Sequence, residues 1–154
     1  MIWGIDVGTA RIAFACGAET RTLTIASERG ARRLALAHDA LKAYSLSLAR
    51  AYPPLCVFVE QPSGQHVNPS LSYMAGVIQS AVYQGLAVLY ANPVSVWTIT
   101  SSEWKALLGL KGNAPKEAVL EWARAHGFKG STQDEADAFG IAWAGALLTA
   151  EKAA

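Results

Sequence analysis

The sequence predicts an α/β fold in which a five-stranded mixed sheet, with its first three strands antiparallel, is flanked by helices. Three observations indicate this class: strand-like runs cluster near the amino terminus, helix-like segments alternate with later apolar runs, and 52% of the 154 residues are hydrophobic while 16% are charged. Such a composition is typical of a globular chain that can bury a sizeable core. Without repeats, linkers or low-complexity tracts, residues 1–154 are expected to form one domain.

Three short strands are predicted at the amino terminus. The apolar residues from Ile2 to Val7 are typical of a central strand, Gly8-Thr9 indicates a tight turn, and a second strand follows over 11–17. Alternation over 20–26 predicts a third strand that completes an antiparallel meander. Asp6 places a carboxylate in the first run, where burial requires a cation, a donor or a metal. Alternatively, its side chain caps the turn.

Helices and strands are predicted to alternate in the middle of the chain. Apolar residues at steps of three and four indicate a helix, short continuous apolar runs indicate buried strands, and Asn68-Pro69 is a helix start. The expected elements are a helix over 29–52, a parallel strand over 55–59 that ends on Glu60, a helix to about Gly85, and a fifth strand over 86–90, after which residues 94–99 lead back into helix.

Three helices are predicted in the last third. Thr100 to Glu103 has the pattern of a capping box and opens a short helix with Trp104 and Lys105, and the polar turn over 110–115 follows it. A further helix is expected over 116–126, and a second capping box over 132–135 opens a helix that runs to about residue 150.

The helix that begins at Pro69 is apolar on more than one side. Leu71, Met74, Ile78 and Val82 define one face, while other apolar and aromatic residues are spread around the remainder. A helix of this kind has to be covered twice. We therefore expect it to pack on the sheet and, through residues Leu71–Gln84, against a second copy of the chain in a homodimer.

Composition also restricts where the protein acts. The chain runs straight into a strand without the basic start of a signal peptide, and no apolar run reaches the roughly 18 residues that cross a bilayer. Cys16 and Cys56 have neither metal-site spacing nor a redox motif, so we expect them to be small buried residues in a reducing compartment. These features predict a cytoplasmic protein without a membrane partner.

Two acids open the last helix on one face. Asp134 and Asp137 are three residues apart, and Ala138 and Ile141 continue the same face, which must meet the sheet. Acids in a first turn also complement the helix dipole, and this simpler interpretation explains Glu135. It does not explain two acids on the buried face, so we expect both at the core-facing start of the helix.

Four carboxylates are thus expected to converge: Asp6, Glu60, Asp134 and Asp137. They cannot share one site as anions without cations between them, and an all-oxygen donor set suits Mg²⁺ or Mn²⁺. Two such ions per site support phosphodiester hydrolysis. With four acids committed to metal, 13 bases face 8 acids, so the remainder carries a charge of +5, which is compatible with a nucleic-acid partner.

The order of elements and acids resembles the RNase H-like superfamily and, within it, the RuvC-type Holliday junction resolvases. The first-strand motif alone is weak, because actin-like ATPases and YqgF-type proteins carry similar strands. The discriminating stretches are Val59-Glu60-Gln61-Pro62, Asn68-Pro69-Ser70 with its glycine-containing helix, and Asp134 to Ala138 running into Ile141-Ala142. Together they cover most of the chain.

This resemblance implies a catalytic, metal-binding tetrad of Asp6, Glu60, Asp134 and Asp137. It also implies that Lys105 and Lys116 contact the phosphate, with Lys116 stabilising charge in the transition state, although both could be ordinary solvated lysines. Further candidate DNA contacts are Lys111, in the polar turn, and the cluster Arg29, Arg32 and Arg33, which equally fits a solvated helix face. The implied partner is branched DNA such as a four-way junction.

Two features of the sequence depart from the pattern of this family. The chain is short for these resolvases, which fits a compact, phage-type member. Where bacterial resolvases carry an aromatic wedge shortly after the Glu-Gln pair, this chain has Pro62-Ser63-Gly64, so another residue, with His66 as one candidate, would have to stack on an unpaired base. Among the tryptophans, Trp97 and Trp104 are the better candidates for a contact surface. The alternative functions are an RNase H-like or YqgF-type nuclease on RNA or hybrids, and a non-catalytic junction-binding protein.

Overall fold

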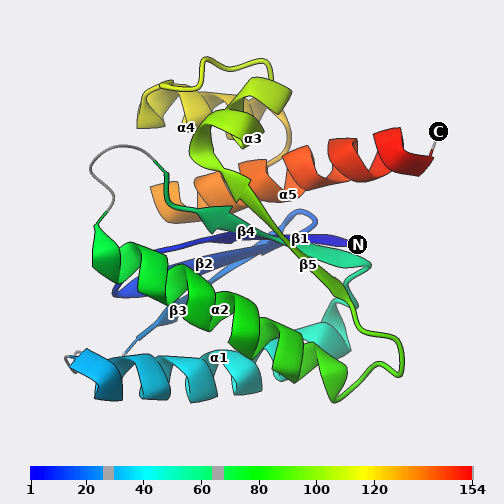
Figure 1. Ribbon diagram of the computed structural model, residues 1–154. Coiled ribbons are helices and arrows are strands. Elements are labelled where there is room, and N and C mark those ends of the chain that lie inside the picture. The colour runs from blue at the N-terminus through cyan, green and yellow to red at the C-terminus, as the bar shows by residue number, and fades with distance from the viewer. Residues whose placement is uncertain (26–29, 64–67, 154) are drawn as a thin grey trace.

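A twisted sheet lies between two layers of helices in the computed structural model, which describes residues 1–25, 30–63 and 68–153 (Figure 1). The strands are β1 (Ile2–Asp6), β2 (Arg11–Cys16), β3 (Glu19–Thr24), β4 (Cys56–Gln61) and β5 (Ser95–Thr100). The helices are α1 (Gly30–Ala51), α2 (Pro69–Ala87), α3 (Ser101–Leu107), α4 (Lys116–Ala125) and α5 (Gln133–Ala153).

The sheet has the predicted mixed topology. Its strand order is β3-β2-β1-β4-β5, with β1 to β3 antiparallel and with β4 and β5 each parallel to its neighbour. Tight connections allow the first three strands to pair as a meander, whereas β1 and β4 run parallel because α1 carries the chain back between them. This pairing brings the carboxyl ends of β1, β4 and β5 to one edge of the sheet.

The fifth strand is not where the sequence indicated. Residues 86–87 form the last turn of α2, and the backbone amides of Leu89 and Tyr90 both donate to the carbonyl of Leu86. The strand is instead Ser95–Thr100, so residues 95–99 are strand rather than a lead back into helix. A short apolar run suits either a strand or a buried helix end, and in this chain the run of α2 simply continues.

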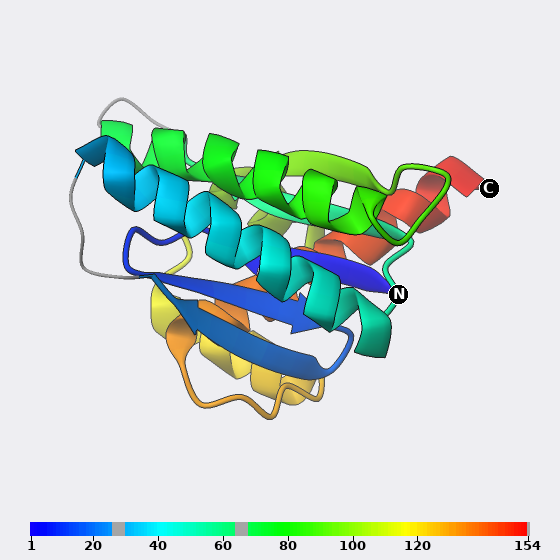
Figure 2. The same ribbon diagram turned by 90° about the horizontal axis from the view of Figure 1, so that it is seen from below.

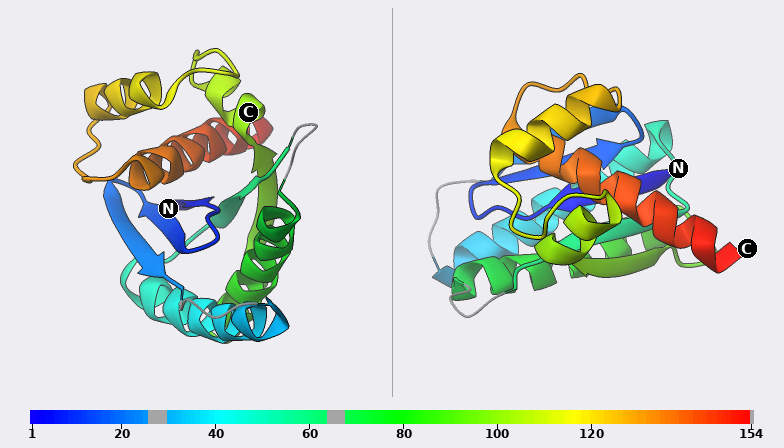
Figure 3. Two further views of the ribbon diagram at one scale, coloured as in Figure 1. Left: turned by 90° about the vertical axis from the view of Figure 1, so that its left-hand side faces the viewer. Right: turned by 90° about the horizontal axis from the view of Figure 1, so that it is seen from above.

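Alternate side chains along each strand point to opposite faces of the sheet. Trp3, Ile5, Val57 and Val59 pack in the core beneath α1 and α2, which lie side by side on that face (Figure 2). Alternate residues point the other way, toward α5 and the two shorter helices α3 and α4 (Figure 3). Residues two apart share a face of a strand, so Asp6 and Glu60 face the α5 layer.

Helix α5 lies unusually close to the sheet. A Cβ atom at Gly4 would lie 2.2 Å from the carbonyl oxygen of Ala138, and one at Gly145 would lie 2.4 Å from the ring of Phe58. Glycine at both positions therefore permits the backbone of α5 to approach β1 and β4. Both predicted capping boxes are present, and they set where α3 and α5 begin.

Helix α2 is covered on one side by the sheet and on another by α1 (Figure 2). Part of the apolar surface that the sequence assigned to a second copy is thus buried within the chain. Tyr73 and Tyr83 remain exposed, at 67% and 45%. Both cysteines are buried and unpaired, as expected. No helix among the described residues is long and apolar enough to cross a membrane.

Candidate active site

The ends of β1 and β4 bring two carboxylates together. Ile5 pairs with Val59 in the parallel register, so Asp6 and Glu60 follow side by side and on the same face. The pKa of Asp6 is raised well above its ordinary value, first by burial, then by a hydrogen bond with Glu60 and by the negative charges of the other acids. A carboxylate in this setting favours a proton or a cation.

Asp137 on α5 belongs to the same group. Burial is the main cause that raises its pKa to about 6, and the charge of Glu60 raises it further. Three groups oppose this effect: the amide of Gln133 donates to Asp137 Oδ1 at 3.0 Å, and Lys105 and Lys116 supply positive charge. Asp137 therefore lies on the buried face, as the spacing predicted. The first turn of α5 lies at the end of the molecule where β4 ends (Figure 1).

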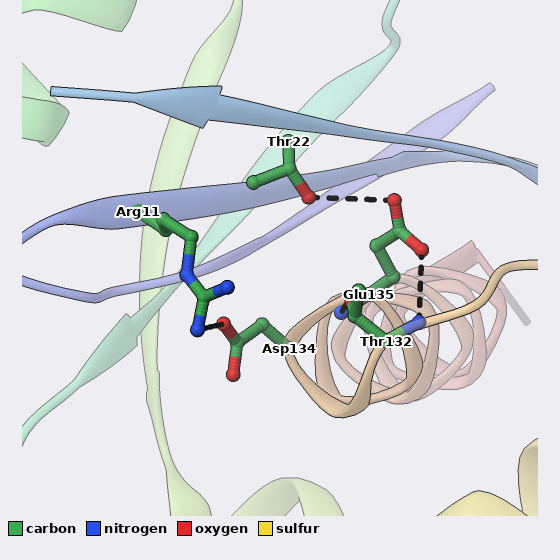
Figure 4. Close-up of polar contacts among 5 residues, drawn as sticks. All are labelled: Arg11, Thr22, Thr132, Asp134 and Glu135. Atoms are coloured by element: carbon green, nitrogen blue, oxygen red, sulfur yellow. Dashed lines mark hydrogen bonds and ion pairs between the residues drawn. The ribbon is translucent and has the colours of Figure 1, made fainter.

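Asp134 has a different environment from the one expected. Its carboxylate lies 3.7 Å from the guanidinium of Arg11 on β2, and 29% of its side chain is exposed (Figure 4). The sequence did not indicate this ion pair, in which a cation from the neighbouring strand faces a partly exposed Asp134. Asp134 still lies near enough to Asp6 to raise its pKa. Glu135 caps the helix and accepts from Thr22 at 3.3 Å.

The donor chemistry of this cluster fits Mg²⁺ or Mn²⁺. All four predicted ligands are carboxylates, and the pKa values of Asp6 and Asp137 are raised first by burial and then by neighbouring negative charge, both of which a cation would offset. Within residues 1–25, 30–63 and 68–153, however, no three acids, histidines or cysteines are already arranged to hold an ion. An ion held by these acids would therefore require some of their side chains to move.

Positive charge lies beside the acids on α3 and α4. Lys105 is half-buried, and its Nζ donates to the carbonyl of Ala114 at 3.4 Å. Lys116 is exposed in the first turn of α4, and both lysines act electrostatically on Asp137. Lys111 is exposed in the turn between these helices. The structure therefore brings Lys105 and Lys116 to the carboxylates, whereas Lys111 is only nearby in the chain.

Two members of the predicted arginine cluster, Arg32 and Arg33, lie at the start of α1. Arg32 is exposed in the first turn of α1, and Arg33 is half-buried beside a cavity of about 450 Å³ that Tyr73 and Met74 also line. A smaller groove of about 320 Å³ lies next to Glu60. Arg29 and His66 lie outside the described residues.

Trp104 is buried in the core, which corrects its interpretation as a contact surface. It is 1% exposed, and its indole Nε1 donates to Glu60 Oε1 at 3.2 Å. Sequence reasoning did not find this contact, because the two residues are far apart in the chain. It also missed Gln133, although the i, i+4 spacing to Asp137 could have indicated that pair. Trp97, at 48% exposure, remains on the surface.

The comparisons with known proteins concern the fold. No protein-family model and no curated protein sequence matches this chain. A Thermus thermophilus RuvC structure is similar over 98% of this chain and 96% of that one, at 20% identity and a TM-score of 0.70. T. thermophilus RuvC in complex with Holliday junction substrate is similar over 98% and 95%, at 23% identity and a TM-score of 0.74.

A third similar structure comes from yeast. The mitochondrial Holliday junction resolvase Ydc2 is similar over 98% of this chain and 81% of that one, at 14% identity and a TM-score of 0.53. The strand order and the helical layers described above agree with these structures. The predicted resemblance is thereby confirmed at the level of the fold: this chain has the RNase H-like fold of the RuvC-type Holliday junction resolvases.

Proposed function

We propose that this chain is a Mg²⁺-dependent, structure-selective endonuclease that resolves four-way DNA junctions by paired phosphodiester hydrolysis. The observation that carries the proposal is the convergence of Asp6, Glu60 and Asp137 at one edge of the sheet, with Lys105 and Lys116 beside them. The fold supports it, because one of the similar structures is described as bound to a Holliday junction.

The proposed division of work follows from the positions of the side chains. Asp6, Glu60, Asp134 and Asp137 would hold two Mg²⁺ ions, with Mn²⁺ as a substitute. When bound, the metal supplies an activated water and stabilises the leaving oxygen. Lys116 is exposed and free to approach a phosphate, where its charge would stabilise the transition state. Lys105 is half-buried, so its range of movement is smaller.

Other parts of the surface would position the DNA. Lys111 lies in the turn between α3 and α4, the helices that carry Lys105 and Lys116. Arg32 and Arg33 lie at the start of α1. Contacts of these residues with backbone phosphates would set the register of the junction without reading its sequence. Pro62 and Ser63 replace an aromatic wedge, which favours action on several branched DNAs over strict base preference.

A homodimer through α2 would give paired cuts. Tyr73 and Tyr83 are the large exposed residues of this helix, and a two-fold axis would pair them with the same surface on a second copy. Two sites related in this way cut opposed strands of a symmetric junction. Sedimentation analysis at micromolar concentration tests the assembly, and a monomer that nicks only one strand would contradict it.

The central experiment is a strand-resolved cleavage assay. A synthetic four-way junction, its linear duplex and an RNA–DNA hybrid are incubated with Mg²⁺ or Mn²⁺ and wild type, Asp137→Asn or Glu121→Gln. Glu121 is an exposed acid on α4 and serves as the matched control. We expect symmetric cuts in opposite arms of the junction by wild type and Glu121→Gln, and no cuts by Asp137→Asn.

Two outcomes would favour the alternatives. Cleavage of the hybrid with the junction left intact would indicate an RNase H-like or YqgF-type nuclease. Tight junction binding in Ca²⁺ without cleavage in Mg²⁺ or Mn²⁺ would indicate a non-catalytic junction-binding protein. Equal cleavage by Asp137→Asn would refute the proposed site.

A further inference from the structure

Trp104 makes a contact that the proposed reaction does not yet use. Its indole Nε1 donates to Glu60 Oε1 at 3.2 Å, and the side chain is 1% exposed. The tryptophan side chain has a single N–H donor, so a buried indole can donate one hydrogen bond, and its ring orientation fixes which acceptor receives it. The acceptor of this one hydrogen bond is a predicted metal ligand.

The path of the chain explains why the indole meets Glu60. Thr100 ends β5, where Glu60 pairs with Ile99 and Gln61 with Thr100. The same Thr100 caps α3, with its Oγ1 accepting from the Glu103 amide at 3.3 Å and its own amide donating to Glu103 Oε2 at 2.7 Å. The capping box thus starts α3 directly beside Glu60, and Trp104 follows in its first turn.

The surrounding core leaves the indole little freedom. A Cβ atom at Gly140 of α5 would lie 2.9 Å from Trp104 Cζ3, so the helix backbone packs directly against the ring. Ile99, Val119 and Ile141 are buried in the same cluster. A ring enclosed in this way cannot turn its N–H elsewhere without moving α5.

Trp104 also contacts the neighbouring cation. Lys105 Nζ lies 5.3 Å from the centroid of the Trp104 ring, within the range of a cation–π interaction. The indole therefore lies between Lys105, which acts electrostatically on Asp137, and Glu60, which contacts Asp6. One buried side chain touches both the acidic and the basic parts of the site.

We propose that Trp104 is a positioning residue: its indole N–H holds the Glu60 carboxylate in one orientation beside Asp6, so that this ligand is preorganised before a metal ion binds. This inference rests on the proposed metal site. Groups that orient metal ligands affect affinity even though they do not touch the ion, typically by about 10–100-fold. Loss of the N–H should therefore weaken metal binding more than it weakens the fold.

The test compares two tryptophans. Trp104→Phe retains an apolar ring and removes the donor, while Trp3→Phe is the matched control, because Trp3 is also fully buried and donates its Nε1 to a backbone carbonyl, that of Tyr52, at 2.9 Å. Mn²⁺ affinity of the DNA-free protein is measured by titration calorimetry, and unfolding temperature is measured alongside. We expect about tenfold weaker Mn²⁺ binding for Trp104→Phe, and wild-type affinity for Trp3→Phe.

A second readout separates positioning from loss of structure. In Trp104→Phe, the Mn²⁺ concentration for half-maximal junction cleavage should rise, while the rate at saturating Mn²⁺ recovers most of the wild-type value. If Trp104→Phe does not fold, Gly140→Ala carries the test, because its methyl group displaces the ring without removing the donor. Weaker Mn²⁺ binding is expected for this variant also.

The outcomes distinguish this inference from the function on which it rests. Mn²⁺ affinity that stays at the wild-type value in Trp104→Phe, or falls equally in Trp3→Phe, would overturn the positioning role and leave the metal site intact. Failure of the unsubstituted protein to bind Mn²⁺ would overturn the proposed metal site and this inference together.

Discussion

Replacing Asp137 by asparagine is expected to stabilise the metal-free protein at neutral pH. Asparagine keeps the size of the side chain and an oxygen for the Gln133 amide, which donates to Asp137 Oδ1 at 3.0 Å. It removes the buried negative charge. Because burial raises the pKa of Asp137 to about 6, the folded state carries a cost whenever this group is ionised.

The size and pH dependence of the effect follow from linkage. The difference between an ordinary value of 3.8 and a pKa of about 6 corresponds to about 3 kcal/mol. Between these values the folded state binds more protons than the unfolded state, so the free energy of unfolding falls as pH rises through this range. The free energy of unfolding of Asp137→Asn should therefore exceed that of wild type by up to about 3 kcal/mol at pH 8, and this difference should nearly vanish at pH 4.

Urea unfolding with EDTA at a series of pH values from 4 to 8 measures this difference. Glu121→Gln is the control, because it also removes one acid but from an exposed position on α4. We expect its stability to follow wild type at each pH. An Asp137→Asn protein that is no more stable than wild type at pH 8, or whose advantage is the same at every pH, would refute the electrostatic account of the site.

Two further predictions address packing and charge. Gly4→Ala should lower the free energy of unfolding by about 1–3 kcal/mol in urea titrations, because its Cβ would meet the Ala138 carbonyl. Gly76→Ala is the control and should be mildly stabilising, because a Cβ there meets nothing within 4 Å. An equal loss of stability in both variants would contradict this packing argument. Lys116→Ala should reduce the junction cleavage rate by about 100-fold with little change in unfolding temperature, whereas Lys129→Ala, an exposed lysine outside the acidic cluster, should cleave as wild type does.

Local patterns identified most elements correctly because their signals lie within a few residues of one another. The capping boxes at Thr100 and Thr132 set the starts of α3 and α5, and both are present. The antiparallel meander followed from alternation and short turns. The fifth strand was placed wrongly at 86–90, because an apolar run of that length carries no signal that separates a strand from a helix end.

The part of the candidate site that the sequence predicted also depends on local patterns. Asp6 and Glu60 end apolar strands, and periodicity placed Asp137 on the buried face of its helix, so the sequence alone indicated that these acids would meet. It could not show that Arg11 holds Asp134 at 3.7 Å, since no local pattern joins β2 to α5. Periodicity also could not show how much of the apolar surface of α2 is buried within the chain, because α1 covers part of that helix.

The sequence by itself determined the class of fold, the mixed sheet and the acids at the ends of its strands, since each of these depends on residues close together in the chain. Only the tertiary structure decided how these acids are held. Trp104 reaches Glu60 across 44 positions, and Gly140 confines its ring from a third element. Such contacts depend on how separate elements pack against one another. Residues that are far apart in the chain form no periodic pattern from which the contact could be predicted.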